Sequence, residues 1–249
     1  MFDIGRSTFA RGFSMIELLV AMAITSIIMV TLFSLVGQTT TSYTQTQRAV
    51  NAVSQARAFI QFFDRELSTR LPGTPLVHEK KSAAGGPSSS ERIAFVRALT
   101  ADEFTDTDPG DLGTSIYYVA FSNDGSRGES PKLFRKSLGS KETQEKIIEA
   151  GNTPTLPTVD PTKDEPIIPN VLSFEATPMY RDTANGELKE WVNGSPQPPS
   201  VVELEITFID DSSAQRFKTQ AEWNRLATSP RDNELQLVRT FTRNIAIAK

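Results

Sequence analysis

The sequence predicts an α+β fold in which one long N-terminal α-helix packs on a head made of antiparallel β-strands. Residues 13–36 form an almost uninterrupted apolar run. Proline does not occur between Phe13 and Leu71, so one helix can continue through this whole segment. After residue 75 the chain changes to short apolar stretches separated by turns, which is typical of antiparallel strands.

The composition excludes several classes of function. The formal net charge of −4, from 26 basic and 30 acidic residues among 249, offers no electrostatic footprint for nucleic acid. The chain has no cysteine, which excludes disulfides and thiolate metal sites. Its single histidine, His78, excludes a site with several histidines and most triad-type hydrolases. Because His78 lies in the polar segment 76–90, we expect a solvated histidine in a flexible loop.

The apolar run 13–36 has the length of a membrane span, since about 20 helical residues cross a hydrocarbon core of roughly 30 Å. Arg6 and Arg11 precede the run, and the next basic residue is Arg48. The excess of positive charge on the first side places residues 1–12 in the cytoplasm and the rest of the chain outside it.

Two simple interpretations of this segment compete. A cleaved secretory signal usually has a shorter apolar core and a small-residue cleavage site after it, and neither feature is found here. An ordinary single-pass anchor explains the length and the charges but leaves Glu17 unexplained. A carboxylate about one turn inside a membrane is costly, so it indicates a function and a positively charged partner.

The stretch RGFSMIELLV, residues 11–20, resembles the class III signal of type IV prepilins and type II secretion pseudopilins. In that family a basic leader ends in glycine, followed by phenylalanine, a glutamate at the fifth mature position and an apolar helix. The resemblance implies that a prepilin peptidase cuts between Gly12 and Phe13 and N-methylates Phe13. It also implies that Glu17 of one assembled subunit pairs with the N-terminal amine of a neighbour and sets the axial register.

The sequence therefore divides into four segments, with a prepilin leader at 1–12 and a transmembrane or filament-core helix at 13–36. An amphipathic second half of the helix at 37–71 and a β-rich head at 72–249 complete the chain. The amphipathic half has an apolar stripe that we expect to cover the apolar face of the sheet; its members are Val53, Ala56, Ile60, Phe63 and Leu67. We expect a kink or partial melting where Gly37 and Thr39–Thr41 weaken the helix.

Alternation of apolar residues places the strands of the head. We expect strands at 92–99, 115–121, 132–137, 171–180 and 201–209, with the second and third pairing as a hairpin, and a strand or short helix within 235–247. A short helix is expected at 140–150, and loops at 76–90, 102–113 and 151–169.

The head resembles pseudopilin J (general secretion pathway protein J) or the related minor pilin W group. The matching positions are Tyr118, Leu133, Arg135, Trp191, Pro199 and Val201. This resemblance implies a non-enzymatic minor subunit in the tip complex of a type II secretion pseudopilus. Its implied partners are other minor and major pseudopilins, the prepilin peptidase and an inner-membrane assembly platform. The protein would be single-pass in the inner membrane with a periplasmic head.

Two alternatives remain open at this point. One is a minor pilin of a type IV pilus, acting in adhesion, motility or DNA uptake. The other is a membrane-anchored ligand-binding or enzymatic domain, which would keep Met1 and present a concave polar site.

The remaining candidate chemistry is weak. The loop DEFTDTDPGD carries four aspartates, and carboxylates at short spacing can hold calcium; they are Asp102, Asp106, Asp108 and Asp111. A solvated acidic loop is the favoured interpretation, because the spacing does not match an EF-hand. No cofactor is expected. Trp191 and Trp223 are expected to be partly buried anchors.

Overall fold

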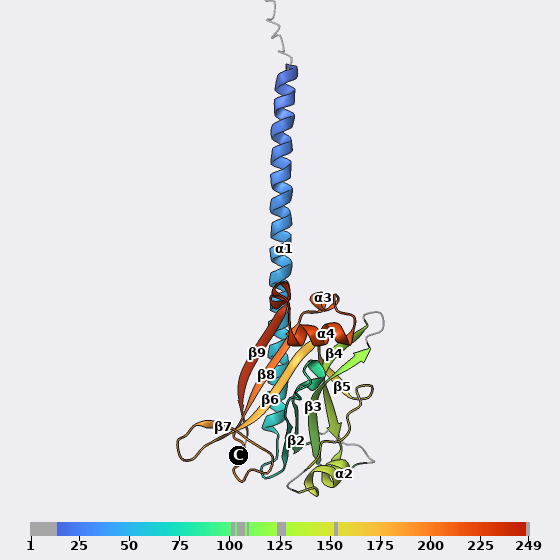
Figure 1. Cartoon of the computed structure of the whole chain (residues 1–249), viewed down its shortest axis with the longest axis vertical. Coiled ribbons are helices and arrows are strands. Elements are labelled where there is room, and N and C mark those ends of the chain that lie inside the picture. The colour runs from blue at the N-terminus through green and yellow to red at the C-terminus, as the bar shows by residue number, and fades with distance from the viewer. Residues whose placement is uncertain are drawn as a thin grey trace, which may run out of the picture. The chain divides into compact units, whose positions relative to one another are not determined.

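The computed structural model describes residues 14–100, 103, 108, 110–123, 128–151 and 154–247. The chain divides into two compact units, one ending at Arg48 and the other beginning at Ala49. Helix α1 (Met15–Ser68) runs from the first unit into the second, so the expected long N-terminal helix is present (Figure 1).

The segment around residue 40 is helical throughout, so the predicted local melting is wrong. Three threonine hydroxyls there donate to backbone carbonyls one turn earlier: Thr39 to Leu35 at 2.8 Å, Thr40 to Val36 at 2.9 Å and Thr41 to Gly37 at 2.9 Å. These bonds satisfy the three hydroxyls locally, and the helix continues through them without interruption.

The head contains two antiparallel sheets. The first has the order β1-β2-β3-β4-β5. Its strands are β1 (Leu76–Glu79), β2 (Arg92–Ala98), β3 (Leu112–Asn123), β4 (Glu129–Leu138) and β5 (Glu165–Pro169). The second has the order β7-β6-β8-β9 (Figure 1). Its strands are β6 (Val171–Arg181), β7 (Leu188–Glu190), β8 (Val201–Ile209) and β9 (Val238–Ala246).

Short helices fill the connections. They are η1 (Pro87–Ser89), α2 (Ser140–Thr143), the π-helical turn η4 (Gln144–Ile148), α3 (Asp211–Ala214), α4 (Gln220–Thr228) and α5 (Asp232–Leu235). Asp210 caps α3, and Thr219 and Glu222 form a capping box at α4, which explains why these helices begin where they do. The helix expected at 140–150 is confirmed as α2 and η4.

The main core lies between the C-terminal part of α1 and both sheets. Its centre is aromatic: the Phe63 ring lies 5.0 Å from Tyr117 of β3, and Phe59 lies 6.3 Å from Phe174 of β6. The α1 residues buried here are Ala52, Ala56, Phe59, Phe63 and Leu67. The predicted stripe is therefore partly wrong. Val53 is exposed and Ile60 is half-buried, whereas Ala52 and Phe59 are buried. The side of the helix that contacts the two sheets therefore includes Ala52 and Phe59 and leaves Val53 outside.

Several sequence-based expectations for the head fail in the same way. The segment 76–90, expected as a loop, contributes β1 and η1, and His78 is buried. The segment 151–169 contributes β5, which pairs with β4 and buries Ile168. In both cases pairing with the adjacent strand of the first sheet, β2 for β1 and β4 for β5, decides the structure.

Other expectations are confirmed. Strands β2, β3, β4, β6 and β8 lie where alternation placed them, and β3 and β4 pair as the expected hairpin. The segment 235–247 forms strand β9. Both tryptophans are buried: Trp191 is 7% exposed, and Trp223 is fully buried and donates to the Glu129 carbonyl at 3.0 Å.

Candidate assembly site at the N-terminal helix

The first part of α1 presents apolar side chains on all sides. Among its large apolar residues, relative exposure runs from 51% at Ile28 to 85% at Met15. By length and composition the helix could cross a membrane, with a mean hydropathy of 2.5 in its most apolar stretch. An apolar surface of this extent requires a cover, either lipid or other apolar helices.

Three hydroxyl groups within this segment are hydrogen-bonded by the helix itself. Thr25 donates to the Ala21 carbonyl and Ser26 to the Met22 carbonyl, each at 2.8 Å. Thr31 donates to the Ile28 carbonyl at 2.8 Å. Because these hydroxyls are hydrogen-bonded locally, they can enter an apolar environment at low cost.

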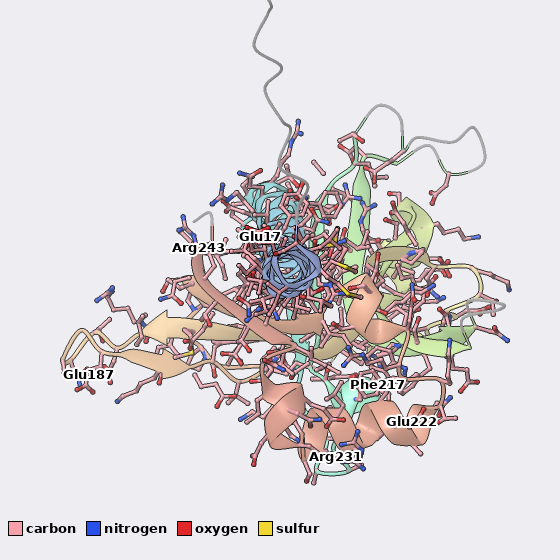
Figure 2. The ribbon with its side chains drawn as sticks, turned by 90° about the horizontal axis from the view of Figure 1, so that it is seen from above. Glu17, Glu187, Phe217, Glu222, Arg231 and Arg243 are labelled. Atoms are coloured by element: carbon pink, nitrogen blue, oxygen red, sulfur yellow. The ribbon has the colours of Figure 1, made fainter. Side chains whose placement is uncertain are left out.

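Glu17 lies in the first turn of α1, at the near end of the helix in Figure 2. Its Oε2 accepts from the Ser14 backbone N–H at 2.8 Å and from the Ser14 hydroxyl at 3.0 Å. The Ser14 hydroxyl accepts in turn from the Glu17 N–H at 3.3 Å. The two residues form a reciprocal capping box at the positive end of the helix dipole.

This geometry adds a role within its own helix to Glu17, while its pairing with a neighbouring chain stays a prediction. One carboxylate oxygen is already used inside its own helix. Within the described part of the chain, Oε1 accepts no hydrogen bond. The carboxylate can therefore cap its helix and accept from an external cation at the same time. Ser14 was missed by the sequence reasoning, although the spacing Ser-x-x-Glu is a known signal for a capping box.

Two other predicted site residues, Gly12 and Phe13, lie outside the described residues. Cleavage between them and methylation of Phe13 therefore stay predictions.

Farther along α1, a buried ionic cluster joins the helix to the first sheet. Glu66 lies 2.5 Å from Arg135 of β4 and 3.5 Å from Arg97 of β2, and it accepts a hydrogen bond from the Tyr117 hydroxyl of β3. Arg97 also forms a two-bonded pair with Glu103. This pairing with Arg97 holds the pKa of Glu103 well below its usual range. Burial, followed by the nearby Glu66 charge, raises the pKa of Tyr117.

This ionic cluster fixes the rotation of α1 against its sheet. The cluster also gives a structural role to Arg135, a residue that the sequence indicated only through a family resemblance. Its guanidinium lies 5.5 Å from the centre of the Phe62 ring in addition to contacting Glu66. Tyr118, another of these positions in the same hairpin, donates to Asp164 at 2.7 Å.

A second buried pair links the two sheets. His78 Nε2 lies 3.0 Å from Glu91 Oε2, and Glu91 also accepts from the Ala176 backbone N–H of β6 at 2.7 Å. The expectation of a solvated His78 is wrong, because β1 pairs with β2 and carries this side chain into the interior. The His78–Glu91 pair therefore connects β1 to β6.

The aspartates of the acidic loop do not gather into a metal site in the described residues. Asp108 accepts from the Lys141 N–H at 3.1 Å, beside the first turn of α2. No group of three or more potential metal ligands occurs among the residues the structure describes. Asp102 and Asp106 lie outside them, and Asp111 precedes β3.

The prokaryotic N-terminal methylation motif matches residues 9–33, the segment that carries Gly12, Phe13 and Glu17. No curated protein matches the chain in sequence.

Two solved structures are similar to the chain. One is a type IV-like pilin, TTHA1219 from Thermus thermophilus, with 14% identity and a TM-score of 0.44 over 80% of this chain and 98% of that one. The other is the GspK-GspI-GspJ complex of the type 2 secretion system of enterotoxigenic Escherichia coli, with 14% identity and a TM-score of 0.39, covering 79% and 97%. The chain thus combines a prepilin-type methylation motif with a long N-terminal helix followed by antiparallel sheets.

Proposed function

We propose that the protein is a non-enzymatic structural subunit of a pilin-type filament. It is made as a precursor, cut between Gly12 and Phe13, methylated at Phe13 and assembled through α1. The observation that carries this proposal is the coincidence of the methylation motif with an exposed apolar helix whose charged first-turn residue is Glu17.

The exposed apolar surface has to stay out of water both before and after assembly. Burying a large apolar side chain is worth about 1.5–3 kcal/mol relative to leaving it in water. Lipid covers this surface before assembly, and the corresponding helices of neighbouring subunits cover it in the filament. Because lipid and helix surfaces are both apolar, apolar contact alone does not select one register of packing.

Glu17 supplies that selection. Its Oε2 is held by Ser14, which fixes the side chain, and its Oε1 is left to accept from a cation. The cation is the methylated amine of Phe13 on a neighbouring subunit, created by the cleavage itself. An unpaired carboxylate in an apolar surrounding is strongly disfavoured, so packing registers without this pairing are suppressed.

We further propose that the filament is a type II secretion pseudopilus and that this chain is a minor subunit of its tip. The protein would sit in the inner membrane with its head in the periplasm and would contact other pseudopilins, the peptidase and the assembly platform. The resemblance of the head to the J family supports this. The alternative is a minor pilin of a type IV pilus. Loss of exoprotein secretion on deletion supports the first role, and loss of surface pili with normal secretion supports the second.

Mass spectrometry of the mature protein tests the processing step. We expect an N-terminus at Phe13 that carries one added methyl group. The substitution Gly12→Leu should leave the leader attached. Gly37→Leu is the matched control, because no atom lies within 4 Å of the position a Cβ would occupy there. A functional protein that still begins at Met1 would refute the proposal.

Three substitutions separate the two roles of Glu17. Glu17→Gln keeps the capping acceptor but removes the charge, and Glu17→Val removes both. Ser14→Ala removes the two bonds of the Ser14 hydroxyl and leaves the charge and the backbone N–H bond in place. We expect all three to insert into the membrane, and only Ser14→Ala to be incorporated into filaments. Cross-linking and filament purification measure incorporation. Normal incorporation of Glu17→Gln would show that charge pairing does not set the register.

A further inference from the structure

His78 and Glu91 form a buried pair where the two sheets of the head meet. The side chain of His78 is 2% exposed and that of Glu91 is 10% exposed. His78 belongs to β1 of the first sheet, and the Glu91 carboxylate accepts from the Ala176 N–H of β6, in the second sheet, at 2.7 Å. The single histidine of the chain therefore lies at a junction between the sheets.

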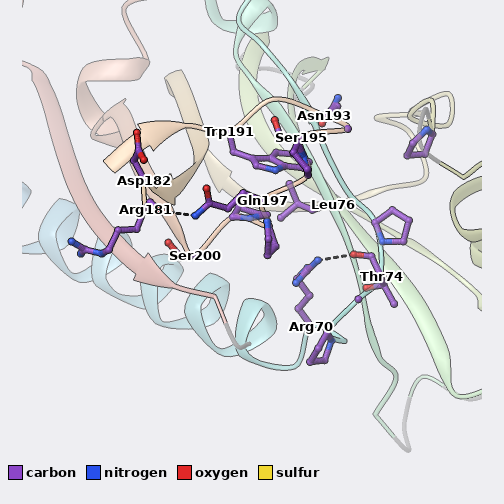
Figure 3. Close-up of a pocket in the computed structure, with 18 of the residues that line it drawn as sticks. Arg70, Thr74, Leu76, Arg181, Asp182, Trp191, Asn193, Ser195, Gln197 and Ser200 are labelled. Carbon is purple, nitrogen blue, oxygen red and sulfur yellow. Dashed lines mark hydrogen bonds between the residues drawn. The ribbon is translucent and has the colours of Figure 1, made fainter. Parts of the chain in front are cut away.

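The backbone on both sides of this junction is held in place. The Asn193 side chain accepts from the His78 N–H at 3.0 Å and donates to the His78 carbonyl at 2.9 Å. Asn193 belongs, with Trp191, to the stretch before β8 that lines the pocket in Figure 3. Glu91 donates its N–H to the Phe174 carbonyl of β6 at 2.9 Å. Because both backbones are fixed, the imidazole and the carboxylate stay close to each other.

The surroundings of Glu91 suit an ionised carboxylate. Besides the Ala176 N–H, the Thr177 hydroxyl lies 3.2 Å from Oε1 and 3.1 Å from Oε2. These groups donate hydrogen bonds, which an ionised carboxylate accepts through both oxygens. A buried charge of this kind is costly unless an opposite charge accompanies it.

The other charged groups on the strands around the pair are already matched. They form three ion pairs at the surface: Glu79 with Arg92 at 3.0 Å, Lys80 with Glu190 at 2.6 Å and Lys81 with Glu175 at 2.7 Å. Within the described part of the chain, no lysine or arginine nitrogen lies within 4.0 Å of the Glu91 carboxylate. Among these residues, the cation that faces the carboxylate can therefore come only from His78.

The contact between the two side chains depends on charge. His78 Nε2 lies 3.0 Å from Glu91 Oε2, yet the buried Nε2 has no aligned hydrogen-bond partner among the residues that the structure describes. An attraction that is not a directed hydrogen bond is electrostatic, and here it requires a positive imidazole. A neutral ring would leave the carboxylate without a countercharge.

We propose that the His78–Glu91 pair is a pH-sensitive lock between the two sheets. With the imidazole protonated, the ion pair is complete and joins β1 to β6. When the imidazole loses its proton, Glu91 keeps a buried charge without a cation, and the junction is weakened. Imidazole is the side chain that ordinarily changes its charge between pH 5 and 8. The proposal uses only residues of the head, so it does not rest on the assembly function.

Proton linkage gives the sign of the effect. The ion pair exists in the folded head and not in the unfolded chain, so folding strengthens the binding of the proton to His78. The stabilisation is therefore present at the acidic end of the range, below the ordinary titration of an imidazole near pH 6.5, and it is lost as the pH rises above it.

Urea unfolding of the full-length protein in detergent, between about pH 5.5 and 8.5, measures the effect. We expect the equilibrium constant of unfolding to increase about tenfold across this range, and by less than about twofold in His78→Gln and in Glu91→Gln. The chain has no cysteine, and the N-terminal amine, which titrates near pH 8, is kept in both variants. Glu79→Gln removes an exposed pair on the same strand and is the matched control, which should keep the tenfold change.

Nitrogen NMR of the untagged protein measures the charge of the imidazole without any substitution, because His78 gives the only histidine signals. At about pH 7.5 an ordinary imidazole is protonated in roughly one tenth of the molecules. We expect this fraction in urea, and at least about half in the folded protein, as a tenfold stabilisation of the protonated form requires.

This measurement keeps the test valid if a variant does not fold. Equal protonated fractions in the folded protein and in urea would overturn the proposal. So would an unfolding constant of the unmodified protein that stays level or decreases as the pH rises. An equal pH dependence in the unmodified protein and His78→Gln, or its loss in Glu79→Gln, would also overturn it.

Discussion

The substitution Glu66→Gln removes a negative charge that two buried arginines share. The side chain of Glu66 is 10% exposed, that of Arg97 is 3% exposed and that of Arg135 is 13% exposed. Glu66 also accepts the Tyr117 hydroxyl. After the substitution, Glu103 and Glu165 still contact the arginines, but α1 no longer contributes a charge to the cluster.

The expected loss follows from this geometry. Removing one member of a buried ion pair costs about 3–5 kcal/mol when the partner is left uncompensated. Here both arginines keep a carboxylate, and glutamine keeps an oxygen acceptor for Tyr117. We therefore expect a decrease of about 2 kcal/mol in the free energy of unfolding of the head.

Urea unfolding of the full-length protein in detergent, followed by tryptophan fluorescence, measures this loss. Glu165→Gln is the matched control. Its side chain is 61% exposed although it contacts Arg135 at 3.1 Å, and we expect it to cost no more than about 0.5 kcal/mol. Tyr117→Phe combined with Glu66→Gln should cost slightly less than the sum of the single changes, since Glu66→Gln already weakens the charge-assisted bond that Tyr117→Phe removes. Equal costs for Glu66→Gln and Glu165→Gln would refute the reasoning.

Three further predictions concern single contacts in the head. The Asn193 side chain accepts from the His78 backbone N–H at 3.0 Å and donates to the His78 carbonyl at 2.9 Å, on edge strand β1. Asn193→Ala should therefore destabilise β1 by about 1–2 kcal/mol. Unchanged hydrogen exchange of the His78 amide would contradict this. Pairing with Arg225 lowers the pKa of Glu234 from 4.5 to about 2. This pair therefore stabilises the fold above pH 4.5 and loses its effect as the pH falls toward 2. The thermal unfolding temperature of Glu234→Gln should accordingly depend less on pH in that range than that of the unmodified protein. Gly128 has a φ of +83° and a carbonyl oxygen 2.8 Å from the position of a Cβ, so Gly128→Ala should lower the urea midpoint by an amount equivalent to about 1–3 kcal/mol.

Much of the fold follows from local patterns in the sequence. The alternation Val202, Leu204, Ile206, Phe208 places β8 and its buried face correctly. The same is true of the β3–β4 hairpin, whose two strands are close in sequence. Local patterns succeed where a segment has one buried face and its partner is a sequence neighbour.

The same patterns fail where a polar or proline-containing segment is buried by strand pairing or ion pairing that no local alternation signals. The stretch that forms β5 has two prolines and reads as a loop, yet it pairs with β4 at the edge of the first sheet, where a missing N–H is tolerated. His78 lies in a polar stretch, and only pairing with β2 and contact with Glu91 bury it. Helix α4 is short, and its burial depends on the packing of Trp223.

Local sequence alone predicts the N-terminal helix and marks Glu17 as an unusual charge within it, because length and apolarity are local properties. The resemblance to prepilins adds Gly12 and Phe13 as candidate processing residues, and it too is carried by a short run of residues. The tertiary structure decided the division into two sheets, the sharing of Glu66 between two arginines and the contact of Glu91 with β6. Each of these depends on which charges and strands, far apart in the chain, are brought into contact, and local periodicity contains no information about such contacts.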